Sequence, residues 1–117
     1  MLGDPHSPIL AKLMDVASLR ARIHATNLAN QNTPGYRAKA VAFEVDFHAA
    51  LAAGGDIDAV EPRVYEPRDT AQDVDGNDVA TDREVLQSAE NTTLYNTYIT
   101  LARGQAKLMA TAISPAP

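Results

Sequence analysis

Residues 27–36, N-L-A-N-Q-N-T-P-G-Y, decide how the first part of this chain folds. Asparagine is a poor residue for a helix interior, because its amide competes for backbone hydrogen bonds. Pro34 cannot continue a helix, and Gly35 readily adopts positive φ. The stretch therefore predicts that a helix ends and the chain turns. Three asparagines are more than a helix end requires, which indicates a further role for Asn27, Asn30 and Asn32.

The residues before this stretch predict a helix over about 8–31. Ser7 is a good N-cap residue, and Pro8 suits the first helical position, where no amide donor is needed. A seam with alternating four-three spacing, typical of a coiled coil, is apolar at first and polar at its end; it comprises Ile9, Leu13, Val16, Arg20, Ile23, Asn27 and Asn30. A second stripe beside it comprises Leu10, Met14, Ala17, Ala21 and Leu28. The apolar face is thus wider than one partner helix requires.

The C-terminal segment predicts a long helix over about 82–113, roughly 48 Å at about 1.5 Å per residue. Thr81 and Glu84 have the spacing of a capping box, and Pro115 ends the pattern. A three-four spacing gives the expected packing seam: Val85, Ser88, Thr92, Tyr95, Ile99, Ala102, Ala106, Met109 and Ile113. An adjacent face carries Leu94, Tyr98, Leu101 and Leu108. Such a length favours an elongated molecule.

Charge is distributed unevenly along the chain. Residues 54–84 hold ten of the fifteen acids and only three bases, whereas residues 85–117 hold one acid and two bases. At positions where a solvated helix usually carries Glu and Lys, the C-terminal helix carries threonine and asparagine. This neutral surface suits burial among other helices. An equally simple interpretation is that the segment is one helix of a small bundle whose surface happens to be neutral. The acidic middle predicts a solvated, loosely ordered segment, partly extended or disordered.

The middle of the chain, about 37–80, is expected to be an irregular linker. Residues 41–47 alternate between apolar and polar, which predicts an extended segment, but F-E-V-D-F-H-A-A-L at 43–51 also fits a short helix. Gly54 and Gly55 break any regular structure, residues 63–65 fit a short strand, and residues 75–77 signal a turn.

Several classes of function find no support in the sequence. The net charge of −5 argues against a nucleic-acid binder, and the absence of cysteine excludes thiolate sites and cysteine nucleophiles. His6, His24 and His48 lack the spacing of metal ligands and are expected on the solvated surface. Residues 73–84 begin like a calcium loop but have Asp78 where glycine is needed. We therefore expect no catalytic, cofactor-binding or metal-binding residues, and no enzyme.

The two ends of the chain resemble one known family. N-x-A-N-x-x-T-P-G-Y at the end of a helix is similar to the N-terminal signature of the flagellar basal body rod and hook proteins. D-G-N-D-V followed by A-E-N-T-T-L-Y-N-T-Y-I-T-L-A-R-G-Q-A-K-L-M-A-T-A-I-S resembles the C-terminal end of the short rod proteins. The resemblance covers 8–47 and 75–114. The assembly motif that it marks comprises Asn27, Ala29, Asn30, Asn32, Thr33, Pro34, Gly35 and Tyr36.

The resemblance implies a mainly α fold, a single rod-type domain in which two long terminal helices pair antiparallel and pack into a tubular array. It implies a structural subunit of the periplasmic proximal rod, which transmits motor torque and leaves the cytoplasm through the type III export apparatus without a cleaved signal peptide. Its partners would be further copies of the chain and basal-body subunits of the FlgC, FlgF, FlgG and FliE types. The assembly motif would form a polar turn against neighbouring subunits. An alternative is a helical adaptor or secretion chaperone that binds partners through the same amphipathic ends.

Overall fold

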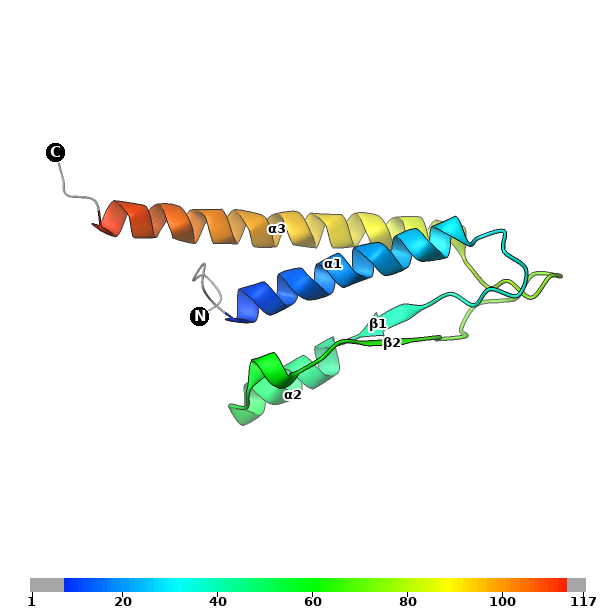
Figure 1. Ribbon diagram of the computed structural model, residues 1–117, viewed down its shortest axis with the longest axis horizontal. Helices are drawn as coiled ribbons and strands as arrows, with labels where there is room; N and C mark the ends of the chain where they lie inside the picture. Colours follow the sequence, from blue (N-terminus) through cyan, green and yellow to red (C-terminus); the bar gives the residue numbers. More distant parts are fainter. Residues whose placement is uncertain (1–7, 114–117) are drawn as a thin grey trace.

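The structure, a computed structural model, describes residues 8–113 and is mainly helical and extended (Figure 1). Its elements, in chain order, are α1 (Pro8–Ala29), β1 (Ala40–Ala42), α2 (Glu44–Ala53), the 3-10 turn η1 (Ile57–Ala59), β2 (Arg63–Tyr65) and α3 (Thr81–Ile113). The prediction of a mainly helical, elongated chain with a long C-terminal helix is confirmed. Ser7, His6 and Pro115 lie outside the described residues.

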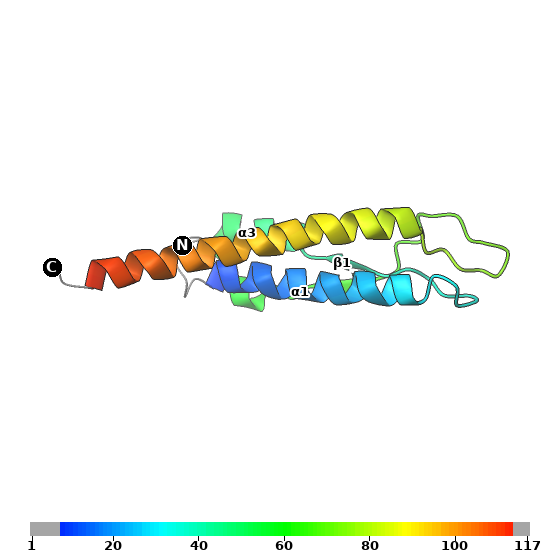
Figure 2. The same ribbon diagram turned by 90° about the horizontal axis from the view of Figure 1, so that it is seen from above.

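The elements form three rows along a molecule that measures 69 × 34 × 14 Å. Both views place α1 and α3 side by side, and Figure 1 shows the β hairpin and α2 on the other side of α1 (Figures 1 and 2). β1 and β2 pair antiparallel, with Val41 opposite Val64. The helix α1 is therefore the central row, covered by α3 on one side and by the middle of the chain on the other.

The apolar core lies between α1 and the middle segment. Val16 of α1 is buried with Phe43 and Phe47, whose rings stack with centroids 5.0 Å apart. Ile9 and Leu13 pack against the same cluster. The first three apolar positions of the predicted α1 seam thus bury against α2 and its flanking residues, whereas Leu10 and Ala17 of the second stripe are buried elsewhere on the helix. Two apolar stripes on α1 correspond to two covered sides.

The expected strand over 41–47 is wrong beyond Ala42, and the short-helix alternative at 43–51 is correct, with α2 observed at Glu44–Ala53. Phe43 and Phe47 are four residues apart, so a helix presents both rings to Val16 on one face. A strand would also place them on one face, but the two rings would lie further apart. Glu44 and Asp46 in the first turn favour the helix through its dipole. Gly54 ends it with φ 66° and an amide bonded to the helix carbonyls. The short strand expected at 63–65 is confirmed.

The capping box predicted for α3 does not form. The hydroxyl of Thr81 donates to the side chain of Gln31 at 2.8 Å, and the Glu84 carboxylate turns toward α1 instead of back to the helix start. The inward-facing side of α3 follows the predicted seam only in part. Glu84 and Asn91, which the predicted seam does not include, are buried, and the half-buried positions that follow on this side of the helix are Ser88, Tyr95, Tyr98, Ile99, Ala102 and Gln105.

The C-terminal turns of α3 extend past the start of α1 (Figure 1). We call residues 101–113 the α3 overhang. All of its residues are exposed except Ala102 and Gln105, which are half-buried. Of the predicted α3 seam, Ser88, Tyr95, Ile99 and Ala102 are half-buried, whereas the other positions are exposed in the isolated chain: Val85, Thr92, Ala106, Met109 and Ile113.

Candidate functional site

Asn27 is the centre of a polar joint between α1, the turn that follows it and α3. Its side chain is completely buried. The amide nitrogen donates to the carbonyl of Lys39 at 2.8 Å and to Oε1 of Glu84 at 2.9 Å. The amide oxygen accepts from the backbone N–H of Lys39 at 3.0 Å and from the Tyr36 hydroxyl at 3.4 Å. Both donors and both acceptor positions of the side chain are thus used within the chain.

Glu84 and His24 complete the polar joint. Nδ1 of His24 and Oε2 of Glu84 share a hydrogen bond of 2.6 Å, and both side chains are buried. Glu84 therefore receives bonds from two residues, His24 and Asn27, that lie one turn apart on α1. Burying a carboxylate is costly unless it is hydrogen-bonded. The pair therefore fixes the position of α3 along α1 more than it adds net stability.

A second contact joins the helices further along. The side-chain nitrogen of Asn91 donates to the backbone carbonyl of Ala17 at 2.8 Å in a buried position. Since Asn91 lies seven residues after Glu84, two turns of α3 present polar side chains to α1. The contact surface between the two long helices is consequently specified by hydrogen bonds, while the apolar core lies on the opposite side of α1.

The turn after α1 docks on residues 75–78. The buried Asn77 side chain donates to the carbonyls of Asn30 at 2.8 Å and Thr33 at 2.7 Å. The N–H of Gly35 donates to the carbonyl of Asp75 at 2.8 Å, with Gly35 at φ 74°. These bonds satisfy carbonyls that the ending helix leaves free. Asn77 and Asp78, expected in a solvated, loosely ordered acidic segment, are instead buried and hold this turn in place.

Asp78 extends the docked turn toward the hairpin. Its Oδ1 accepts from the backbone N–H of Ala38 at 2.6 Å, and its Oδ2 lies 3.6 Å from the Arg37 guanidinium. The N–H of Asp78 donates to the carbonyl of Tyr36. The turn is therefore anchored by backbone and side-chain bonds from both ends of residues 75–78.

The residues of the assembly motif divide into two groups. Asn27 is buried, and Asn30 and Tyr36 are half-buried within the joint and the docked turn. The others are exposed at the surface of the turn: Ala29, Asn32, Thr33, Pro34 and Gly35. The asparagine at 30 donates to the carbonyl of Thr26 and accepts from the Thr33 hydroxyl. Part of the motif thus builds the subunit itself, and part faces outward.

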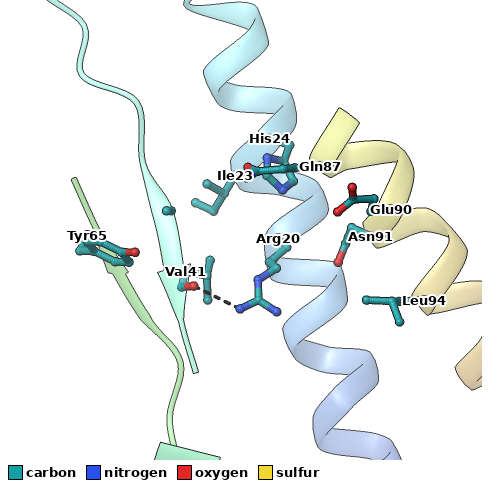
Figure 3. Close-up of a pocket in the computed structure, with 10 residues that line it drawn as sticks. Arg20, Ile23, His24, Val41, Tyr65, Gln87, Glu90, Asn91 and Leu94 are labelled. Atoms are coloured by element: carbon teal, nitrogen blue, oxygen red, sulfur yellow. Dashed lines mark hydrogen bonds between the residues drawn. The ribbon is translucent and has the colours of Figure 1, made fainter. Parts of the chain in front are cut away.

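An open groove of about 320 Å³ runs along α1 between α3 and the hairpin. Figure 3 shows Arg20, Ile23 and His24 of α1 as its floor, with residues of α3 on one side and Val41 and Tyr65 on the other. Arg20 donates to the carbonyl of Val41 at 3.1 Å and to Glu44 at 2.7 Å, so its charge is already paired. We call this the α1 groove. Ile23, predicted as part of the helix seam, lies in it.

The described residues offer little basis for a metal centre or a membrane span. Residues 8–113 contain no group of three His, Asp or Glu side chains placed to hold a metal ion. Within the same range, none of the helices combines the length and apolarity that a bilayer crossing requires. His24, expected on the solvated surface, is buried against Glu84, and this expectation is wrong.

Sequence reasoning missed five buried residues of the site: His24, Asn77, Asp78, Glu84 and Asn91. The sequence places Glu84 in a capping box and Asn77 in a solvated turn. A signal for His24, Glu84 and Asn91 is present, because His24 and Asn27 are three apart on one helix face, and Glu84 and Asn91 are seven apart on one face of the other. The partner of Asn77 could not be inferred, because it is backbone some forty residues away.

Comparison with family models and with curated proteins found no match for this chain.

Proposed function

We propose that this chain is a structural subunit of the bacterial flagellar basal body, positioned in the proximal rod. Within the family that its two ends resemble, the A-E-N near the start of α3 favours FlgB, with the sister proximal rod protein FlgC as the alternative. The observation that carries the proposal is the meeting of the two stretches that bear the resemblance. Asn27 contacts Glu84, and Asn30 contacts Asn77.

Antiparallel pairing of the terminal helices is part of this proposal. Contacts at the start of α3 join the end of α1, through Glu84 and His24, whereas contacts two turns later join its middle, through Asn91 and Ala17. This order supports helices that run in opposite directions. The elongated shape, 69 Å in its longest dimension, fits a subunit whose axis follows a filament.

The surface of α3 also supports assembly. Its exposed side chains include Val85, Leu86, Leu94, Leu108 and Ile113, together with many uncharged polar residues. Large exposed apolar side chains that recur along one helix are typical of contacts completed in an oligomer. In a rod, these positions would be covered by neighbouring copies and by the other basal-body subunits, in the periplasm, after export through the type III apparatus.

Deletion of the gene in the source organism tests the proposal. We expect non-motile cells whose basal bodies, viewed by electron microscopy, lack a rod. Motile cells with complete basal bodies would contradict it.

The alternative function is a helical adaptor or secretion chaperone. Measuring the helix content of the dilute chain by circular dichroism distinguishes it from a rod subunit. A rod subunit should lose helix on dilution, because the uncovered turns of α3 are marginal alone. An adaptor should keep its full helix content and melt cooperatively.

A further inference from the structure

A stripe of leucines leads along α3 out of the α1 groove. Leu94 lines the groove, and Leu101 and Leu108 follow at intervals of seven residues. Their side chains are 49%, 38% and 63% exposed. A leucine every seven residues is the pattern of one core position of a coiled coil. The stripe is on a helix whose contact with α1 uses other positions, so it is free to meet a further helix.

The charges on the same part of α3 are unbalanced. After Glu90, the helix contains no acid, and its only charged residues up to Ile113 are Arg103 and Lys107. These two bases are four residues apart, a spacing at which like charges repel on a helix. Glu90 is exposed and lies at the α1 groove, with no base on its own helix within four residues. The carboxylate of Glu90 at the groove is therefore opposite in charge to the two bases of the overhang.

A displacement of two heptads brings these features together. It places Leu108 of one helix beside Leu94 of a parallel copy, and Leu101 beside Gln87 in the groove. The same displacement places Gly104 opposite Glu90, flanked by Arg103 and Lys107. Glycine in a helix interior costs about 1 kcal/mol relative to alanine. No atom lies within 4 Å of where a Cβ at Gly104 would be, so the isolated chain gives no packing reason for this glycine.

We propose that the α1 groove receives the α3 overhang of a second copy of this chain, parallel to its own α3 and displaced by about 20 Å, the length of two heptads. The groove volume of about 320 Å³ accommodates a few side chains but not a whole helix. The overhang therefore lies along the mouth of the groove and inserts only side chains. Leu101 and Leu108 enter it, and the two bases bracket Glu90. Groove and overhang are different surfaces, so the contact is heterologous and repeats along a filament. This inference rests on the proposed function and names one of the contacts by which the subunits assemble.

Charge reversal in the full-length chain tests the proposed contact. We expect Glu90→Lys to weaken self-association, measured by sedimentation velocity, by about tenfold, because it sets three cations together. Arg103→Glu combined with Lys107→Glu should weaken it similarly, and the chain that carries all three changes should regain association. Val45→Lys, at an exposed position on α2, is the matched control and should leave association unchanged. Equal association of all variants, failure of the triple change to restore it, or a wild-type chain that stays monomeric would overturn the inference.

Disulfide trapping tests the direction of the contact. The sequence has no cysteine, so Gln87→Cys with Leu101→Cys introduces the only two thiols. Parallel, displaced copies should give a ladder of covalent multimers on oxidation, whereas an antiparallel, two-fold contact would stop at a dimer and overturn the inference. Failure here leaves the rod function intact if deletion of the gene still removes the rod. A deletion strain with normal rods would instead remove the proposed function.

Discussion

Asn27 of α1 and Glu84 of α3 are 57 residues apart in the sequence and share a buried hydrogen bond of 2.9 Å. The same asparagine binds both backbone groups of Lys39. A single side chain therefore holds the end of one long helix, the chain that leaves it and the start of the other. This relationship explains why an asparagine occupies a helix position where an apolar residue would otherwise bury more surface.

Replacing Asn27 by alanine should loosen the polar joint. The change leaves the N–H and carbonyl of Lys39 without their partner, and a buried unsatisfied group costs about 1–3 kcal/mol. We expect a loss of that size in the free energy of unfolding, together with faster amide hydrogen exchange at Lys39. Asn32→Ala, in the exposed part of the motif, is the control and should leave both unchanged. Equal effects at the two positions would show that the joint does not form.

Glu84→Ala should destabilise the chain by about 3 kcal/mol, because removing one partner of a buried pair leaves the other unpaired. Glu84→Gln should cost less, since the amide keeps the shape and one acceptor oxygen, although its NH₂ group faces a donor. Urea unfolding measures both. Glu90→Ala, at an exposed position six residues further along α3, should change the unfolding free energy by less than about 0.5 kcal/mol. A Glu84→Ala chain as stable as the Glu90→Ala control would contradict a buried role for Glu84.

Gly35→Ala should cost about 1–2 kcal/mol, because residue 35 has φ 74° and side chains with a Cβ are strained there. A Cβ would meet no atom within 4 Å, so the cost comes from the backbone alone. Gly35→Asn should be milder, because asparagine tolerates this conformation. In the source organism we expect Gly35→Ala and Asn30→Ala to abolish motility while export of the subunit continues. Normal rods in these strains would argue against a role for the turn in assembly.

The contact between Arg20 and Glu44 should make stability depend weakly on pH. Burial raises the pKa of Glu44, but the hydrogen bond and charge of Arg20, together with backbone hydrogen bonds from Glu44 and Phe43, lower it by more, so the pKa lies below its ordinary value of 4.5. A lowered pKa means that the ionised form stabilises the fold, so the contribution is present above pH 4.5 and is lost as the pH falls below it. The pair is half exposed, and we expect about 0.5 kcal/mol or less. Glu44→Gln should remove this part of the pH dependence, and an NMR titration in Arg20→Met should find the Glu44 pKa raised.

The long helices could be predicted from the sequence, because their apolar spacing and their end signals are local. The expected bounds of 8–31 and 82–113 differ by two residues or fewer from Pro8–Ala29 and Thr81–Ile113. The packing register of α3 could not be predicted, because the apolar periodicity places Val85, not Glu84, on the buried face. A buried acid violates the binary pattern and is acceptable only through specific partners on another element, His24 and Asn27.

The middle of the chain shows where local signals conflict. Phe43 and Phe47 fit both a strand and a helix, and the decision depended on tertiary contact with Val16. Asn77 gave a correct turn signal, but its docking on the carbonyls of Asn30 and Thr33 depends on a chain path that no local pattern encodes. The sequence therefore placed the assembly motif at the end of a helix and left open what the motif contacts.

Mass spectrometry of purified hook–basal bodies from the source organism decides whether the chain is a rod subunit. If the chain is a proximal rod subunit, its peptides should co-purify with the basal body at a constant ratio to other rod subunits and remain after washes that strip loosely bound proteins. Their absence from intact, rod-containing basal bodies would contradict the account.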